Sequence, residues 1–239
     1  MRKITVTGDD GVYPPSEDSF LLMSAVEKAK GNVLDMCAGS GIIGLNAAKY
    51  ASHVTLVDIN EKALSSIRKT AISQHIKNLS TVRSDLFSSL DGEVFDTIYI
   101  NPPYLPDSRT GSDMDLALNG GKHGYELTMR AIAGIKQHLA PDGSAFVILS
   151  TAYDTKKVYK LIKSFKLNFE ILGTRSFFFE DLILIRIYGK RRTGNVGRTD
   201  NSSRYNKRRS ATSQGKNIER SEGHTGHVET RHSRRGQEC

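Results

Sequence analysis

The chain has 239 residues, of which 38% are hydrophobic, so it is long enough for one well-buried domain and a shorter appendage. Its formal net charge of +8 comes entirely from residues 190–239, which hold 13 Lys and Arg against 5 Asp and Glu, while residues 1–189 hold 21 of each. This distribution excludes a charge-based case for nucleic-acid binding by the neutral body.

The two cysteines, Cys37 and Cys239, lie in different contexts and give no disulfide framework. The N-terminus lacks the apolar core of a signal peptide, and no apolar run is long enough to span a membrane. The default expectation is therefore a reduced, cytoplasmic location with no membrane contact.

Short apolar runs alternate with amphipathic stretches, a pattern typical of a βαβ series over a parallel sheet. Helices are predicted at residues 16–28, 41–50, 61–75, 125–139 and 154–165. Strands are predicted at residues 33–36, 54–57, 80–83, 95–100, 145–149, 169–173 and 182–188. Because no helix separates the last two strands, they predict an antiparallel hairpin at the edge of the sheet. The long polar loop at residues 105–121 is of the kind that often forms a lid.

Two parts are expected: a domain at residues 1–189 and a basic tail at residues 190–239. The tail is rich in Arg, Ser, Gly, Asn and Thr, and it has too few apolar residues to offset its ordering entropy, so we expect it to be disordered. A basic tail can hold RNA through phosphate contacts, or it can be a solvated extension. Its histidines and Cys239 lack the spacing of a zinc site, and no metal is predicted anywhere.

A glycine-rich turn follows the first predicted strand. Asp35 lies at the end of that strand, and Gly39 and Gly41 allow the backbone to turn sharply and approach a ligand closely. The helix N-terminus beyond the turn presents free N–H groups that suit a carboxylate or another anion. The turn by itself does not separate ligand binding from simple packing.

Acidic residues follow the second and third predicted strands. Asp58 can accept hydrogen bonds from both hydroxyls of a ribose, and Asp85 can accept one from an adenine amine while Leu86 packs on the ring. The alternatives are a helix cap for Asp58 and a surface turn for Asp85. With the glycine turn upstream, the ribose role is favoured.

A dinucleotide is the competing ligand, because Gly39, Gly41 and Gly44 fit the pattern G-x-G-x-x-G. Asp35, however, faces the position where a pyrophosphate would lie. A carboxylate there suits the cationic amino group of a methionine moiety better, which favours S-adenosylmethionine.

The most specific signal is Asn101-Pro102-Pro103-Tyr104, which follows the fourth predicted strand. An amide or aniline-like nitrogen has a delocalised lone pair, and breaking this conjugation fully in a peptide amide costs about 18–20 kcal/mol. The Asn101 side-chain oxygen and the Pro102 carbonyl can accept its N–H groups, while Tyr104 stacks on the flat acceptor. The motif predicts methyl transfer by alignment rather than by a strong base. A plain Asn-Pro turn is the alternative.

Together these features resemble the class I S-adenosylmethionine-dependent methyltransferases, an α/β Rossmann-like fold with a seven-stranded, mostly parallel sheet and a terminal antiparallel hairpin. Residues 12–189 are similar to the HemK family of protein-glutamine methyltransferases, which carry Asn-Pro-Pro-Tyr. The run Tyr13-Pro14-Pro15-Ser16-Glu17-Asp18-Ser19 and the glycine-rich residues 120–124 resemble the archaeal and eukaryotic branch. That branch lacks the N-terminal helical domain of the bacterial enzymes.

The resemblance implies roles for individual residues. Cofactor contacts are implied for Ser19, Asp35, Cys37, Gly39, Asp58, Asp85, Leu86 and Asn101, and acceptor contacts for Asn101, Pro102, Pro103 and Tyr104. Catalysis is assigned to Asn101, Pro102 and Tyr104. Cys37 departs from the family, which usually has glycine there, and a positive φ at this residue would cost about 1–2 kcal/mol.

The resemblance also implies a substrate and a partner. The substrate is the glutamine of the Gly-Gly-Gln motif of a translation release factor, and the partner is a small zinc-binding activator protein that covers an apolar edge of the sheet. The main alternative is methylation of an adenine or guanine amine in RNA or DNA, which the neutral body disfavours and the basic tail favours. A non-catalytic, S-adenosylmethionine-binding scaffold is the alternative from another class, and the intact Asn101 argues against it.

Overall fold

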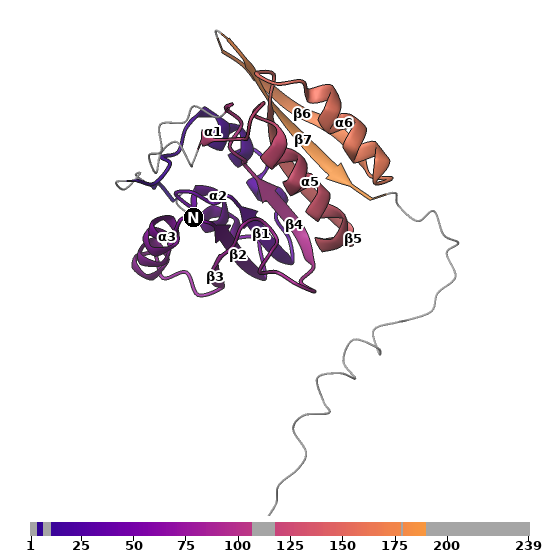
Figure 1. Ribbon diagram of the computed structural model, residues 1–239. Helices are drawn as coiled ribbons and strands as arrows, with labels where there is room; N and C mark the ends of the chain where they lie inside the picture. Colours follow the sequence, from indigo (N-terminus) through magenta and orange to yellow (C-terminus); the bar gives the residue numbers. More distant parts are fainter. Residues whose placement is uncertain (1–3, 7–10, 107–117, 178, 190–239) are drawn as a thin grey trace, which may run out of the picture. The chain divides into compact units, whose positions relative to one another are not determined.

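The computed structural model describes residues 4–6, 11–106, 118–177 and 179–189 (Figure 1). The helices are α1 (Glu17–Met23), the short 3₁₀ helix η1 (Val26–Lys28), α2 (Ile42–Ala47), α3 (Glu61–Ser73), α5 (Glu126–His138) and α6 (Thr155–Ser164). The strands are β1 (Asn32–Met36), β2 (His53–Asp58), β3 (Leu79–Arg83), β4 (Phe95–Ile100), β5 (Leu139–Ser150), β6 (Asn168–Ser176) and β7 (Asp181–Tyr188).

All seven strands form one sheet in the order β3-β2-β1-β4-β5-β7-β6. Strands β1 to β5 run parallel to one another, while β7 is antiparallel to both β5 and β6. The predicted fold class and its terminal hairpin are therefore confirmed. The order reverses between β1 and β4, and in open α/β sheets ligands bind beyond the carboxyl ends of the strands at such a reversal.

Side chains alternate along the strands between two hydrophobic cores, one on each face of the sheet. Val33 and Tyr99 point into the core formed with α1, α2 and α3, whereas the neighbouring Leu34 and Ile100 point into the core formed with α5 and α6. Figure 1 shows α5 and α6 next to each other beside the strands β4, β6 and β7. Burial on both faces explains why the parallel strands are nearly continuous apolar runs in the sequence.

Three local expectations were wrong in detail. The predicted opening helix is divided into α1 and η1, and Ser16 occupies the N-cap position of α1 without a side-chain capping hydrogen bond to any described residue. Strand β5 begins at Leu139, directly after α5, rather than after the Pro141-Asp142-Gly143 turn. Strand β6 continues to Ser176 because an irregularity between Ile171 and Gly173 absorbs one residue and lets pairing with β7 resume.

No helix in the described ranges is long and apolar enough to cross a membrane. The predicted tail at residues 190–239 and most of the predicted lid, residues 107–117, lie outside the described residues.

Candidate active site

A cavity of about 280 Å³ opens at the carboxyl ends of β1, β2 and β4. Its volume is near the lower end of the range for small-molecule sites, roughly 300–1,000 Å³. The lining includes every residue predicted for the site, namely Ser19, Asp35, Cys37, Gly39, Asp58, Asp85, Leu86, Asn101, Pro102, Pro103 and Tyr104. The fold thus brings together residues from five separate segments of the sequence.

Asp35 at the end of β1 lies at the floor of the cavity. Its side chain is 2% exposed, and its Oδ2 atom accepts a hydrogen bond of 2.8 Å from the Gly44 backbone N–H. Burial raises the pKa of Asp35 to about 8, because the low-dielectric surroundings disfavour the charged form. A Cβ at Gly44 would lie 2.6 Å from the Leu56 side chain and 3.0 Å from Asp35 Oδ2, so glycine is required for α2 to pack this closely.

The turn between β1 and α2 needs left-handed backbone conformations. Cys37, Gly39 and Gly41 have φ angles of 58°, 51° and 75°. Cys37 therefore adopts the positive φ that the family's glycine would accommodate. This conformation costs an L-residue about 1–2 kcal/mol. The glycines meet the same requirement without a Cβ.

Asp58 at the end of β2 holds this turn from the side. Its Oδ2 atom accepts from the Gly39 N–H at 2.8 Å, and its Oδ1 atom accepts from the Asn60 N–H at 2.8 Å. The N-cap of α3 is Asn60, whose side chain accepts from the Lys62 N–H at 3.0 Å. The capping role considered for Asp58 therefore belongs to Asn60, which leaves the Asp58 carboxylate facing the cavity beside the glycine turn.

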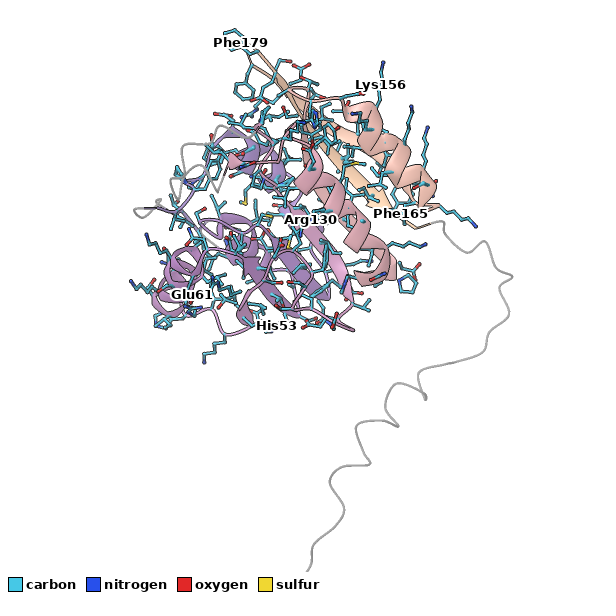
Figure 2. All side chains as sticks on the ribbon, viewed as in Figure 1. His53, Glu61, Arg130, Lys156, Phe165 and Phe179 are labelled. Carbon is cyan, nitrogen blue, oxygen red and sulfur yellow. The ribbon has the colours of Figure 1, made fainter. Side chains whose placement is uncertain are left out.

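Asp85 has a partner that the sequence did not indicate. Arg130 on α5, labelled in Figure 2, donates from Nη2 to Asp85 Oδ2 at 2.7 Å, and both side chains are about half exposed. The neighbouring Leu86 is buried at the cavity wall with a φ of 50°. An ion pair between exposed groups is worth at most about 1 kcal/mol, so a ligand group could compete with Arg130 for this carboxylate.

Asn101 directly follows β4 and lines the cavity. Among the described residues, its side-chain Oδ1 atom is a buried oxygen that has no hydrogen-bond partner. An unsatisfied buried acceptor costs about 1–3 kcal/mol, and such groups in native proteins usually await a ligand or a water. Asn101 is therefore ready to receive an N–H donor from a bound molecule.

The glycine-rich segment before α5 packs directly against the Asn101–Tyr104 backbone. A Cβ at Gly120 would lie 2.7 Å from the Pro103 carbonyl oxygen, and a Cβ at Gly124 would lie 2.5 Å from the Tyr104 carbonyl oxygen. We call residues 101–104 the acceptor loop. The close contacts hold its backbone in place, which explains why glycines recur in the segment before α5.

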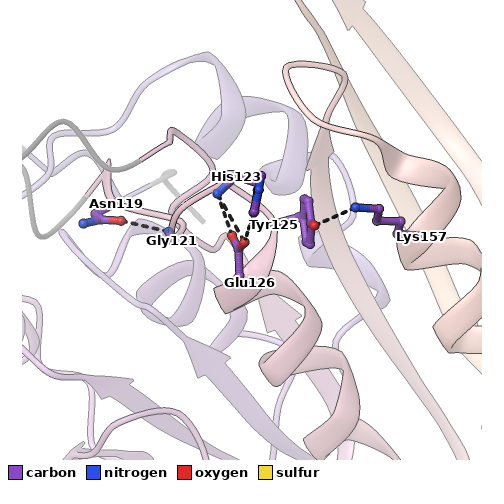
Figure 3. Close-up of polar contacts among 6 residues, drawn as sticks. All are labelled: Asn119, Gly121, His123, Tyr125, Glu126 and Lys157. Carbon is purple, nitrogen blue, oxygen red and sulfur yellow. Dashed lines mark hydrogen bonds and ion pairs between the residues drawn. The ribbon is translucent and has the colours of Figure 1, made fainter.

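Polar contacts fix the same segment to the start of α5 (Figure 3). His123 Nδ1 lies 2.6 Å from Glu126 Oε1, and the Asn119 side-chain oxygen accepts from the Gly121 N–H at 2.8 Å. Lys157 on α6 donates to the Tyr125 hydroxyl at 2.7 Å. Burial raises the pKa of Glu126, but the hydrogen bonds from the side chain and backbone of His123 together outweigh it, so the pKa lies below its usual value.

Sequence reasoning missed two further cavity residues, Tyr13 and Asp18. The Tyr13 hydroxyl donates to Asp18 Oδ2 at 3.0 Å, and Asp18 Oδ1 accepts from the backbone and side chain of Ser19. Burial raises the pKa of Tyr13, and the carboxylate of Asp18 adds to the effect. The signal was present in the run from residue 13 to residue 19, but only Ser19 received a role.

The glycine turn, the Asp58 carboxylate beside it and the order of the strands are together typical of a class I methyltransferase. The model of the family described as "Methyltransferase small domain" matches residues 3–178, and the chain belongs to this family. It is thus an S-adenosylmethionine-dependent N-methyltransferase, and the resemblance to HemK-like enzymes is confirmed.

Similar proteins support this assignment. A Methanocaldococcus jannaschii protein named "Putative protein N5-glutamine methyltransferase" is 33% identical over 182 residues, which are 74% of this chain and 91% of that protein. A ribosomal protein uL3 glutamine methyltransferase of Xanthomonas campestris is 34% identical over 119 residues, but these span only 39% of its length. The structure of the E. cuniculi Mtq2–Trm112 complex, described as acting on the eRF1 termination factor, contains a chain with a TM-score of 0.60 and 26% identity; the match covers 75% of this chain and 99% of that chain.

Proposed function

We propose that the chain transfers a methyl group from S-adenosylmethionine to the side-chain nitrogen of a glutamine, within the Gly-Gly-Gln motif of a class I translation release factor. This proposal rests on the Asn101 Oδ1 atom at the cavity, which has no hydrogen-bond partner within the described part of the chain. The side-chain nitrogen of a glutamine carries two N–H donors, and one of them can pair with this oxygen. The names of the similar glutamine methyltransferases and of the Mtq2 structure support the choice of glutamine.

The residues of the cavity fit the cofactor. The buried Asp35 suits the ammonium group of its methionine part, and the Asp58 carboxylate beside the Gly39 turn suits the two ribose hydroxyls. Asp85 and Leu86 suit the adenine, in competition with Arg130 for Asp85. When bound, the cofactor supplies an electrophilic methyl group on a sulfonium centre.

The acceptor loop then aligns the amide. Asn101 Oδ1 and the Pro102 carbonyl accept the two N–H groups of the glutamine, which fixes the plane of the amide and leaves its lone-pair face toward the cofactor. Tyr104 packs between the two hydrophobic cores and forms the wall on which the flat amide stacks. Alignment and fixed dipoles lower the barrier without a strong base.

Methyl transfer from tritiated S-adenosylmethionine tests the proposal. Three acceptors are compared: a purified release factor, its variant with Gln→Ala in Gly-Gly-Gln, and ribosomal RNA. Label on the unmodified factor alone supports the proposal. Label on the RNA would replace it with the nucleic-acid alternative, while the enzyme class would stand.

Cofactor affinity should depend on pH through Asp35. Its pKa is raised from 3.8 to about 8, so between these values the folded, cofactor-free chain holds a proton that the unfolded chain has lost, and stability falls as pH rises through this window. Binding of an ammonium group favours the ionised form. We therefore expect affinity to rise by up to about tenfold per pH unit between about pH 6 and 7.5.

Isothermal titration calorimetry at several pH values measures this effect. Asp35→Asn is the control, because it removes the titrating group and should give an affinity that is weak and nearly independent of pH. An unchanged slope in Asp35→Asn would show that another group titrates.

The packing of Gly120 against the acceptor loop predicts a second effect. A Cβ there would lie 2.3 Å from the Gly124 carbonyl oxygen and 2.7 Å from that of Pro103, so Gly120→Ala must displace the loop. We expect kcat to fall by about tenfold or more, since small displacements of reacting groups are costly. Steady-state kinetics measure it, and Gly173→Ala, whose Cβ would meet only Leu21 at 3.6 Å, should be neutral.

We also propose that residues 1–189 form the catalytic domain, that residues 190–239 form a separate basic tail able to contact nucleic acid, and that a small zinc-binding activator assists the enzyme. The described elements end with β7 at Tyr188, and the similar Mtq2 chain was solved as a complex with Trm112. Monodisperse, fully active protein prepared alone would contradict the need for an activator.

A further inference from the structure

The connection between β6 and β7 presents two phenylalanines that are exposed to solvent, one of them almost completely. Phe179 is 99% exposed and Phe177 is 40% exposed. Figure 2 shows Phe179 at the far end of the hairpin, on the opposite side of the domain from His53, which begins β2. Single exposed apolar residues are ordinary, but two exposed phenylalanines at the end of one hairpin are a candidate contact for a partner.

The sheet places this tip at the same edge as the cavity. Strand β7 is antiparallel to β5, and Leu182 near its start pairs with Ser150 at the carboxyl end of β5. Strand β5 in turn lies next to β4, whose carboxyl end leads into Asn101. The hairpin end is displaced sideways from the acceptor loop by two strand spacings, about 10 Å. Ile100 is level with Ile185 in the register, so Phe179, six residues earlier, lies roughly 20 Å beyond the end of β4.

Hydrogen bonds tie the described residues at the ends of β6 and β7 to each other and to the end of β5. The Phe177 N–H donates to the Glu180 carbonyl at 2.8 Å, and the Asp181 N–H donates to Thr151 Oγ1 at 2.7 Å. The buried Ser150 hydroxyl donates to the Glu180 carboxylate. A preorganised surface loses less entropy on binding than a flexible one, which favours its use as a contact.

The tip is also joined to the acceptor side of the cavity. Arg175 near the end of β6 forms an ion pair with Glu17 on α1, the residue before Asp18. Burial raises the pKa of Tyr104, and the carboxylates of Asp18 and Glu180 strengthen this effect, which agrees with their nearness to the acceptor loop. Through Arg175 the hairpin is therefore joined to α1, whose Asp18 lines the same cavity as Tyr104.

We infer that Phe177 and Phe179 are a docking surface for the folded domain that carries the acceptor glutamine, an inference that rests on the proposed function. A standard protein interface covers about 800 Å² on each partner, a footprint roughly 30 Å across. A domain whose glutamine reaches Asn101 approaches from the edge beyond which the hairpin projects, so a footprint of this size brings it against the hairpin end roughly 20 Å away. Exposed phenylalanines at that position supply the aromatic anchors that dominate such interfaces.

Methylation kinetics with two substrates test the inference. Phe179→Ser and Phe177→Ser are compared with the wild-type full chain on an intact release factor and on a short peptide containing Gly-Gly-Gln. We expect Phe179→Ser to lower kcat/KM for the intact factor by about tenfold or more, mainly through KM. Activity on the peptide and affinity for S-adenosylmethionine should stay within about twofold of wild type, because the peptide is too small to reach the tip.

Ile72→Ser is the matched control. Ile72 is 77% exposed near the end of α3, and α3 runs back from the cavity edge toward the start of β3, so it lies at the opposite edge of the sheet. It should behave as wild type on both substrates. Equal kcat/KM values for wild type and Phe179→Ser on the intact factor would overturn the inference, and so would a Phe179-dependent dimer in sedimentation. A wild-type enzyme that labels neither substrate would instead overturn the proposed function.

Discussion

Asn101→Ala should lower kcat by at least about two orders of magnitude, which is the scale for removing one preorganised group at a transition state. The substitution removes the Oδ1 acceptor, which has no partner among the residues that the structure describes, so the amide plane is no longer fixed. Single-turnover transfer of the tritiated methyl group measures the chemical step directly. Because the side chain is not required to hold the ribose or the ammonium group, cofactor affinity should change by less than about tenfold.

Calorimetric titration of the same variant with the cofactor is the control. A kcat within about threefold of wild type would contradict the role of Asn101 in catalysis. A large loss of cofactor affinity would instead place the main function of Asn101 in binding.

Asp58→Ala should weaken cofactor binding by about one hundredfold or more, because two charge-assisted hydrogen bonds to ribose contribute about 1.5–3 kcal/mol each. The variant also releases the N–H groups of Gly39 and Asn60, so the turn loses its side support. Calorimetry and the thermal shift on adding cofactor both report the change.

Asp85→Ala is the matched comparison for Asp58→Ala. Asp85 is 49% exposed and already paired with Arg130, so its loss should cost less than about tenfold in affinity. If the two variants weaken binding equally, the assignment of Asp58 to the ribose is wrong.

The sequence was sufficient to predict the sheet and the place of the site. Alternating apolar runs predicted all seven strands, and the absence of a helix after residue 165 predicted the β6–β7 hairpin. Carboxyl ends of parallel strands meet at one edge, so residues that follow β1, β2 and β4 were expected to converge, and the cavity lining contains them. The roles of these residues stay predictions.

Contacts between distant elements could not be predicted in this way. The pairing of Asp85 with Arg130 depends on the packing angle of α5, and the assignment of the α3 cap to Asn60 rather than Asp58 depends on where the helix begins. The contact of Gly120 with Pro103 depends on how a long loop returns to the sheet. Periodicity and spacing carry no information on such distances.

Cys37 places a thiol at the wall of the cavity that we propose binds an electrophilic methyl donor. Burial raises the pKa of this thiol, and the negative charges of Asp58, Asp35 and Asp85 reinforce the effect. Because the thiolate is the nucleophilic form, burial and the acids that we propose to hold the cofactor also keep the nearby sulfur protonated and unreactive. The same carboxylates thus protect the enzyme from alkylating itself, so a cysteine at this position is compatible with turnover.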